Sequence, residues 1–167
     1  MIHWMLVRHA KSDWSDGTLS DAQRPLNQRG KKAAQQLGEK ILTEGLLPER
    51  ILCSTALRTV QTLQGMLQIF SQYSLSPVPE ILYLQELYLA TPTTIQQIVA
   101  QNHGNKTKVM CIGHNPGIEN LASELANKNL EMKTAHLIVF ERETDWANAS
   151  QIGKGWKLLR NLRGEDS

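Results

Sequence analysis

The chain has 167 residues, of which 41% are hydrophobic and 20% are charged, and its formal net charge at pH 7 is +2. This composition is ordinary for a globular protein, and it excludes a disordered or fibrous chain. The small net charge, without a long basic run, argues against nucleic acid or a membrane surface as a partner. We therefore expect one domain over residues 1–167.

Nothing in the sequence resembles a secretion signal or a membrane span. The first apolar run, Ile2–Val7, is too short for either, and no basic segment precedes it. Cys53 and Cys111 each lie inside an apolar run, which is typical of reduced thiols in a core. We expect a cytoplasmic protein, and a monomer because no long apolar patch is evident.

The first half of the chain predicts alternating strands and helices. Apolar residues are continuous in the strand segments and spaced three or four residues apart in the helical ones. The predicted elements are a strand over Ile2–Val7, a polar loop over Lys11–Arg24, a helix from Leu26 that Gly45 and Pro48 end, a strand over Arg50–Cys53, and a helix capped by Ser54 or Thr55 that runs to Phe70.

The second half continues this alternation. Its predicted elements are a loop over Ser71–Pro79, an ambiguous apolar segment over Ile81–Leu89, a helix capped by Thr91 or Thr93 that runs to Ala100, a strand over Lys108–Gly113, a helix from about Pro116 to Leu125, and late strands over His136–Glu141 and Trp156–Leu162. Strands that alternate with helices predict an α/β fold with a mostly parallel central sheet.

Four basic side chains follow three of the predicted strands. Arg8 and His9 end the first strand, Arg58 lies in the first helical turn after the second, and His114 follows the strand that ends at Gly113. If these strands are parallel neighbours, the four side chains converge at the edge where open α/β sheets bind ligands. Helix N-termini at that edge add partial positive charge. The sequence therefore predicts an anion pocket of two guanidinium groups and two imidazoles.

Such a pocket suits attack on phosphorus, because the arginines can hold the phosphoryl oxygens while an imidazole nitrogen approaches. Taken singly, the residues also fit structural roles: Arg8 in a salt bridge, His9 as a loop histidine, Arg58 as a solvated helix residue. The convergence is what favours catalysis. A metal site built from His9, His114, His103 and Cys111 is disfavoured because the motifs contain no ligand triad, so we expect no metal and no cofactor.

The arrangement of motifs resembles the histidine phosphatase superfamily, which includes the phosphoglycerate mutases and acid phosphatases. The resemblance rests on Arg8-His9-Ala10, on the helix start Leu26-x-x-x-Gly30-x-x-Ala33-Ala34, on Ser54-x-x-x-Arg58-x-x-Gln61-Thr62, and on Gly113-His114. Ala33 stands where the family pattern has Gln. Within the superfamily, the short chain, the Arg24-Pro25-Leu26 segment and the run from Gly113 to Gly117 resemble the small SixA-type phosphohistidine phosphatases.

This resemblance implies a three-layer α/β/α sandwich of the phosphoglycerate mutase type. It also implies that His9 attacks phosphorus and forms a covalent phosphohistidine intermediate, which water then hydrolyses. The phosphoryl group would be bound by the remaining basic residues and an amide, namely Arg8, Arg24, Arg58, His114 and Asn115. We expect His9 to be neutral, with its second ring nitrogen held by a backbone carbonyl.

The proton donor for the leaving group is less evident from the sequence. Many members of the superfamily have an acid after the third motif, and Glu86 is the nearest candidate, although it also suits a solvated loop position. Glu80 and Glu119 are weaker candidates. SixA-type members are thought to lack such an acid, which suits a phosphoramidate, so a phosphohistidine protein is the expected substrate. A small-molecule phosphomonoesterase or mutase and a non-catalytic phosphate-binding module are the alternatives.

The loop over Lys11–Gln23 could cover the site as a lid or form a docking rim for a protein substrate. Trp14 lies in the middle of this loop. An exposed Trp14 would favour the rim, but we expect its ring to pack inward.

Overall fold

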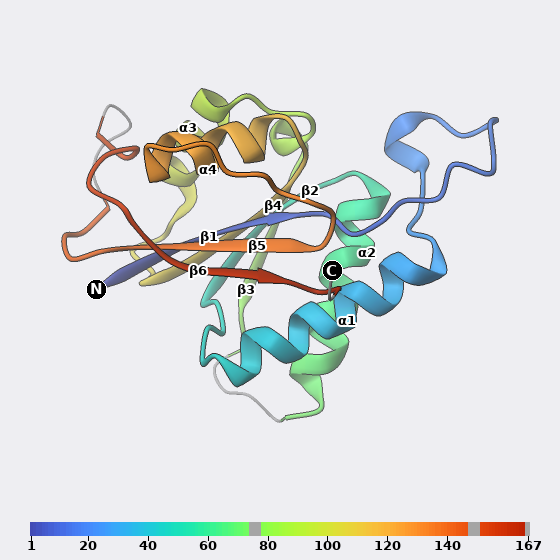
Figure 1. Ribbon diagram of the computed structural model, residues 1–167, viewed down its shortest axis with the longest axis horizontal. Coiled ribbons are helices and arrows are strands. Elements are labelled where there is room, and N and C mark those ends of the chain that lie inside the picture. The colour runs from blue at the N-terminus through green and yellow to red at the C-terminus, as the bar shows by residue number, and fades with distance from the viewer. Residues whose placement is uncertain (74–77, 147–150, 166–167) are drawn as a thin grey trace.

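The computed structural model describes residues 1–73, 78–146 and 151–165 (Figure 1). Its strands are β1 Ile2–Arg8, β2 Arg50–Ser54, β3 Glu80–Leu84, β4 Lys108–Gly113, β5 His136–Arg142 and β6 Lys157–Arg163. Its helices are α1 Gln28–Thr43, α2 Leu57–Ser71, α3 Pro92–Asn102 and α4 Gly117–Ala126, with short 3-10 helices η1 Asp21–Gln23 and η2 Gln85–Leu87. The alternation of strands and helices is as predicted.

The strands form one 6-stranded sheet in the order β3-β2-β4-β1-β5-β6. The pairs β3–β2, β2–β4 and β4–β1 are parallel, whereas β5 runs antiparallel to both of its neighbours. The predicted mostly parallel sheet is therefore confirmed. The order places β4 between β1 and β2, so the three strands that precede the basic residues are neighbours, and Arg8 pairs with Gly113.

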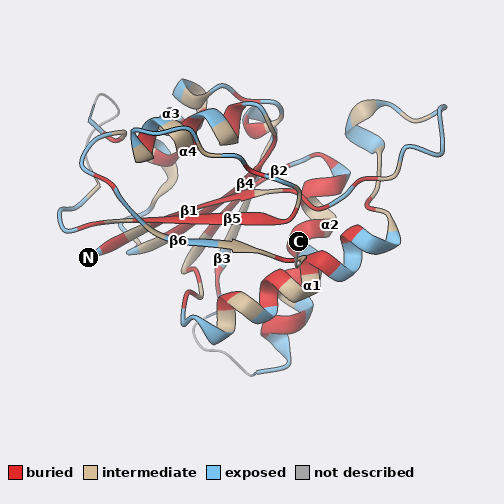
Figure 2. Cartoon of the chain, in the orientation of Figure 1, coloured by how far each residue is buried: buried red, intermediate tan, exposed pale blue. Residues whose placement is uncertain are grey.

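Helices cover both faces of the sheet, with α1 and α2 on one side and α3 and α4 on the other (Figure 1). Central strands are buried on both faces (Figure 2). Successive residues of β1 alternate between the two cores: Met5 and Val7 pack on the side of α1 and α2, and Trp4 and Leu6 on the side of α3 and α4. Burial on both faces explains why this strand is a continuous apolar run. The predicted three-layer α/β/α architecture is confirmed.

Some predicted boundaries were wrong. Neither Ser54 nor Thr55 caps α2: the helix begins at Leu57 after Ala56, and Ser54 is the last residue of β2. The ambiguous segment after Pro79 divides into β3 and η2. Thr91, rather than Thr93, caps α3, because its side chain accepts a hydrogen bond from the backbone N–H of Thr94. The loop predicted before β3 lies partly outside the described residues.

Two further expectations concern the cysteines and the membrane. Cys53 and Cys111 are free and buried, which confirms the prediction of core thiols. Burial raises the pKa of each thiol to about 12, so neither is a thiolate at neutral pH. Of the helices in the described part of the chain, none is long and apolar enough to span a membrane.

Candidate active site

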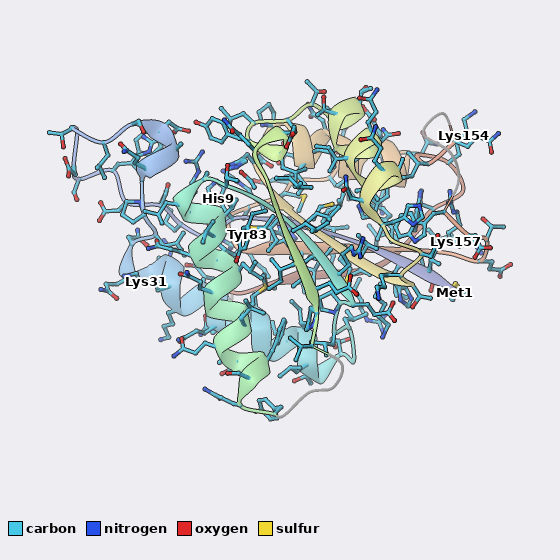
Figure 3. All side chains as sticks on the ribbon, turned by 180° about the vertical axis from the view of Figure 1, so that it is seen from behind. Met1, His9, Lys31, Tyr83, Lys154 and Lys157 are labelled. Carbon is cyan, nitrogen blue, oxygen red and sulfur yellow. The ribbon has the colours of Figure 1, made fainter. Side chains whose placement is uncertain are left out.

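The carboxyl ends of β1, β2 and β4 bring the predicted basic residues together. The backbone N–H of His9 donates to the carbonyl of Gly113 (3.2 Å), which joins the ends of β1 and β4. The rings of His9 and His114 lie 5.3 Å apart, centroid to centroid. Figure 3 shows His9 beside the first turn of α2, at the opposite end of the sheet from Met1. The predicted convergence of these side chains is confirmed.

His9 is held as a neutral imidazole with one nitrogen facing the cluster. Its Nδ1 lies 2.7 Å from the carbonyl oxygen of Ala10, so Nδ1 carries the proton and donates it, as expected from the sequence. Nε2 is then unprotonated, and its lone pair accepts a hydrogen bond from Nε of Arg58 (3.3 Å). Burial lowers the pKa of His9 to about 4, and the charges of Arg58 and Arg8 act in the same direction.

His114 is also neutral, and Ser54 fixes its orientation. Ser54 Oγ lies 2.7 Å from Nε2 of His114. If the hydroxyl donates to Nε2, the proton of the ring is on Nδ1, which is buried and has no hydrogen-bond partner among the described residues. Burial lowers the pKa of His114 to about 3, with His9 and Arg58 as further causes. In that tautomer, His114 offers a neutral N–H donor at Nδ1 that has no partner among the described residues.

Arg58 is almost fully buried, and all of its nitrogens are engaged. Besides the contact of its Nε with His9, Nη1 donates to the backbone carbonyl of Asp21 (2.7 Å) and Nη2 to Oδ2 of the same residue (2.9 Å). Asp21 comes from η1, in the loop that projects beyond the sheet (Figure 1). The side chain of Arg58 is only 5% exposed, whereas that of Asp21 is 40% exposed.

Two further side chains contact Asp21 at the outer side of the cluster. Arg24 forms an ion pair with the Asp21 carboxylate, and the hydroxyl of Tyr88 donates to it. The hydrogen bond from Tyr88 is the main cause that lowers the pKa of Asp21 to about 2. The guanidinium of Arg24 also stacks on Trp14, 3.2 Å from the ring centroid. Trp14 is 66% exposed, so the expectation that it packs inward was wrong.

Arg8 and Asn115 are held on the other side of the cluster by one backbone carbonyl. Nη1 of Arg8 (2.9 Å) and Nδ2 of Asn115 (3.0 Å) both donate to the carbonyl oxygen of Met132. Glu119 holds this arrangement, because its Oε2 accepts from the backbone N–H of Met132 (2.8 Å) and from Nδ2 of Asn115 (3.1 Å). Nε of Arg8 and Oδ1 of Asn115 are buried without a partner among the described residues. Arg8 thus keeps an N–H donor free, whereas the free atom of Asn115 is an acceptor.

The remaining motif residues build the walls of the site. Thr62 accepts a hydrogen bond from the backbone N–H of Ala10 (2.9 Å), and Gln61 accepts one from that of Leu26 (2.7 Å), so α2 holds the segment after His9 and the start of the next helix. A Cβ on Gly30 would lie 2.1 Å from the carbonyl oxygen of Lys11. Glycine is therefore required where α1 begins against the loop.

Glu86, the candidate proton donor, lies in η2 and is exposed. In the described part of the chain, no hydrogen bond or ion pair links it to the basic cluster. Tyr88, two residues later, makes the contact with Asp21 instead. Sequence reasoning missed Asp21, Tyr88 and the role of Ser54. Ser54 was already part of the motif from Ser54 to Thr62. For Asp21, the available signal in the sequence was the oppositely charged Arg24 three residues later.

Of the four residues considered for a metal site, His9 and His114 lie together, but His103 and Cys111 are not near them. His103 follows α3 and stacks on Trp146 with the ring centroids 5.3 Å apart, while Cys111 is inside the sheet. Across residues 1–73, 78–146 and 151–165, no group of three or more His, Cys, Asp or Glu side chains could hold a metal ion. A cavity of about 520 Å³ lies near Met1, far from His9, and its lining mixes acidic and basic side chains. The basic cluster is thus the candidate site.

Comparison with known proteins places these residues in a family. The model of the histidine phosphatase superfamily (branch 1) matches residues 4–82. An uncharacterised chloroplast protein of Arabidopsis thaliana is 30% identical over 161 residues, which are 92% of this chain and 74% of the relative.

Solved structures agree with this placement. A SixA protein from Agrobacterium tumefaciens superposes with a TM-score of 0.81 at 26% identity, covering 96% of this chain and 97% of the other. The protein histidine phosphatase SixA in complex with tungstate has the same fold, with a TM-score of 0.78 at 18% identity over 98% and 97% of the two chains. The chain belongs to the histidine phosphatase superfamily, branch 1, and is of the SixA type.

Proposed function

We propose that this protein is a phosphatase that removes the phosphoryl group from phosphohistidine in a protein, through a covalent intermediate on His9. The observation that carries the proposal is the state of His9. Its Nδ1 is fixed by the carbonyl of Ala10, and its Nε2 is an unprotonated nitrogen among guanidinium groups. A neutral imidazole with its lone pair directed into a basic pocket is an activated nucleophile for phosphorus.

Two displacements complete the reaction. In the first, Nε2 of His9 forms a bond to phosphorus while the P–N bond of the substrate breaks, and the released imidazole keeps the proton that it carried. In the second, water attacks phosphorus, the bond to Nε2 breaks, and phosphate leaves. Arg8 and Arg58 hold the equatorial oxygens, and Nδ1–H of His114 donates to them, because charge neutralisation provides most of the catalysis in phosphoryl transfer. Arg24 is a further binding group, whereas the amide nitrogen of Asn115 already donates to Met132 and to Glu119. The proposal requires no metal.

The carboxylates near the cluster favour a phosphoramidate over a phosphate ester. An alkoxide leaving group needs an acid, whereas a protonated imidazole leaves without one. Asp21 has a pKa of about 2, so it is ionised at neutral pH. Glu119 uses an oxygen to accept two hydrogen bonds. Glu86 stays the candidate acid for esters, but it is exposed and has no contact with the cluster in the described residues.

Relatives support a phosphoryl substrate without identifying it. SixA, whose structure holds tungstate, an analogue of phosphate, is a protein histidine phosphatase. A more distant chain with the same fold, at 12% identity, is a phosphoserine phosphatase from Entamoeba histolytica. The exposed rim formed by Trp14 and its loop suits a protein substrate, so the decisive comparison is between a phosphohistidine protein and small esters.

The test is turnover on a phosphohistidine protein and on a panel of phosphate esters, with wild-type protein and two variants. We expect the wild type to prefer the phosphohistidine protein by tenfold or more in kcat/KM. His9→Ala should lose turnover and also the acid-labile, alkali-stable phosphoenzyme. Glu86→Gln should change hydrolysis of the esters only. Normal turnover by His9→Ala would exclude the nucleophile, and a preference for one ester would move the assignment to a small-molecule phosphatase.

A further inference from the structure

The basic cluster already contains an anion that belongs to the protein, the carboxylate of Asp21. It accepts hydrogen bonds from Nη2 of Arg58 (2.9 Å), from Arg24 and from the hydroxyl of Tyr88. The backbone carbonyl of Asp21 accepts from Nη1 of Arg58 as well (2.7 Å). One residue of a projecting loop thus uses both terminal nitrogens of the most buried arginine in the site.

The side of the guanidinium that Asp21 occupies is the informative point. Nε and Nη2 of Arg58 form one edge of the planar group, and this edge can bind two oxygens of a phosphate at once. In the protein, Nε points to Nε2 of His9 and Nη2 points to the Asp21 carboxylate. A phosphoryl group that lies in line with His9 and uses both nitrogens of this edge needs the position of Oδ2 of Asp21.

We propose that Asp21 is an internal competitor of the substrate: its carboxylate occupies part of the phosphoryl-binding site, and a phosphoryl group must displace it to reach His9. The inference rests on the proposed function, because it assumes that Arg58 binds the phosphoryl group. On displacement, Arg58, Arg24 and Tyr88 exchange the carboxylate for phosphoryl oxygens. Binding and release of phosphate are then coupled to the position of the loop over Lys11–Arg24.

The loop is built so that Asp21 can leave without unfolding the domain. Its other acidic side chains bond only within the loop: Asp13 accepts from the N–H of Ser15, and Asp16 accepts from Thr18. Both loop ends are fixed, since the N–H of Asp13 donates to the carbonyl of Pro25 (2.7 Å). The contacts of Asp21 therefore hold η1, in the returning arm of the loop, against the site.

A purely structural role for Asp21 predicts the opposite effect on anion binding. If Asp21 only held Arg58 in position, its removal would loosen Arg58 and weaken the binding of any anion. If Asp21 competes with anions, then in its absence Arg58 no longer has to release a carboxylate before it binds an anion. The apparent affinity for anions therefore increases. The sign of the change separates the two roles.

The experiment is isothermal titration of the intact protein with tungstate at pH 7.5 and fixed salt. The variant is Asp21→Asn, which keeps the size and removes the charge, and Asp16→Asn is the matched control with the same charge change in the same loop. We expect Asp21→Asn to bind tungstate about tenfold more tightly than the wild type, and Asp16→Asn to stay within about twofold. Asp21→Ala should behave like Asp21→Asn, and inorganic phosphate should show the same order.

Each outcome bears on a different claim. Equal or weaker binding by Asp21→Asn, with wild-type binding intact, overturns the competition and leaves the proposed function standing. An equal gain in Asp16→Asn also overturns it, because the effect would then come from net charge. If neither the wild type nor Asp21→Asn binds tungstate or phosphate, the phosphoryl-binding site itself is wrong, and the competition with it. Melting temperatures of the variants within a few degrees of the wild type exclude misfolding as the cause.

Discussion

At the scale of single residues, burial inside a positive cluster determines the protonation of the two imidazoles. Protonating His9 or His114 would add a third positive charge beside Arg8 and Arg58 in a site with little solvent. For both histidines burial is the largest cause of the lowered pKa, and the arginines add to it. The expectation that His9 is neutral agrees with this lowered pKa, to which burial contributes more than the neighbouring arginines do.

This leads to a prediction for the titration of His9. Because its pKa is about 4, His9 stays neutral from about pH 8 to about pH 5, and its nucleophilic form is lost only on further acidification. An NMR titration of the imidazole ¹⁵N resonances, assigned by comparison with His9→Gln, measures this directly. A midpoint near the ordinary histidine value would contradict the described environment of His9.

At the scale of elements, the parts that could be predicted are those whose sequence pattern reflects burial. β1, β2 and β4 are continuous apolar runs because each has a neighbour on both sides and helices on both faces. β3 is an edge strand with no fully buried residue, so its pattern over Glu80–Leu84 was ambiguous. Boundaries at α2 were missed because Ser54 uses its hydroxyl for His114 rather than as a helix cap.

The same reasoning explains which site residues could be predicted. His9, Arg58 and His114 follow strands and belong to motifs, so topology alone brings them together. The contact between Asp21 and Tyr88 joins residues 67 positions apart, in a loop and a short turn that have no periodic pattern. Nothing local in the sequence indicates that these two segments meet over Arg58.

The contact between Glu119 of α4 and the backbone of Met132 can be tested by substitution. Its carboxylate fixes the backbone of Met132, whose carbonyl holds Arg8 and Asn115. We expect Glu119→Ala to raise KM for p-nitrophenyl phosphate by about tenfold with a smaller change in kcat, equivalent to about 1.4 kcal/mol of binding.

Two further variants serve as controls for Glu119. Glu119→Gln should restore most of the affinity, because the amide oxygen can still accept from Met132. Glu124→Ala removes the same charge from an exposed position of α4. If Glu124→Ala has the same effect as Glu119→Ala, the contact with Met132 does not position Arg8.

At the scale of the whole molecule, all 5 histidines have a pKa below the ordinary value, with burial as the main cause in each case. The unfolded chain therefore binds more protons than the folded protein once the pH falls below about 6.5. By linkage, the free energy of unfolding decreases as the pH falls through this range. The carboxylates with a lowered pKa decrease the free energy of unfolding only at more acidic pH, where they become protonated.

We expect the free energy of unfolding to fall by on the order of 4 kcal/mol between about pH 7.5 and about pH 5, because His9 and His114 each contribute about 2 kcal/mol. Urea denaturation followed by circular dichroism at several pH values measures this slope. In His9→Gln the slope should be smaller, since one of the contributing groups is absent. A stability that is constant or rises toward pH 5 would show that the histidines are not buried as described.

The stack of Arg24 on Trp14 has a consequence for spectroscopy. The chain has 4 tryptophans, and Trp14 is the exposed one: Trp4 and Trp156 are buried and Trp146 is partly buried. A collisional quencher such as acrylamide reaches a surface indole and is kept away from core indoles. Because Arg24 contacts both the indole of Trp14 and the carboxylate of Asp21, the unlabelled protein carries an intrinsic fluorescent reporter on the loop that contacts the basic cluster.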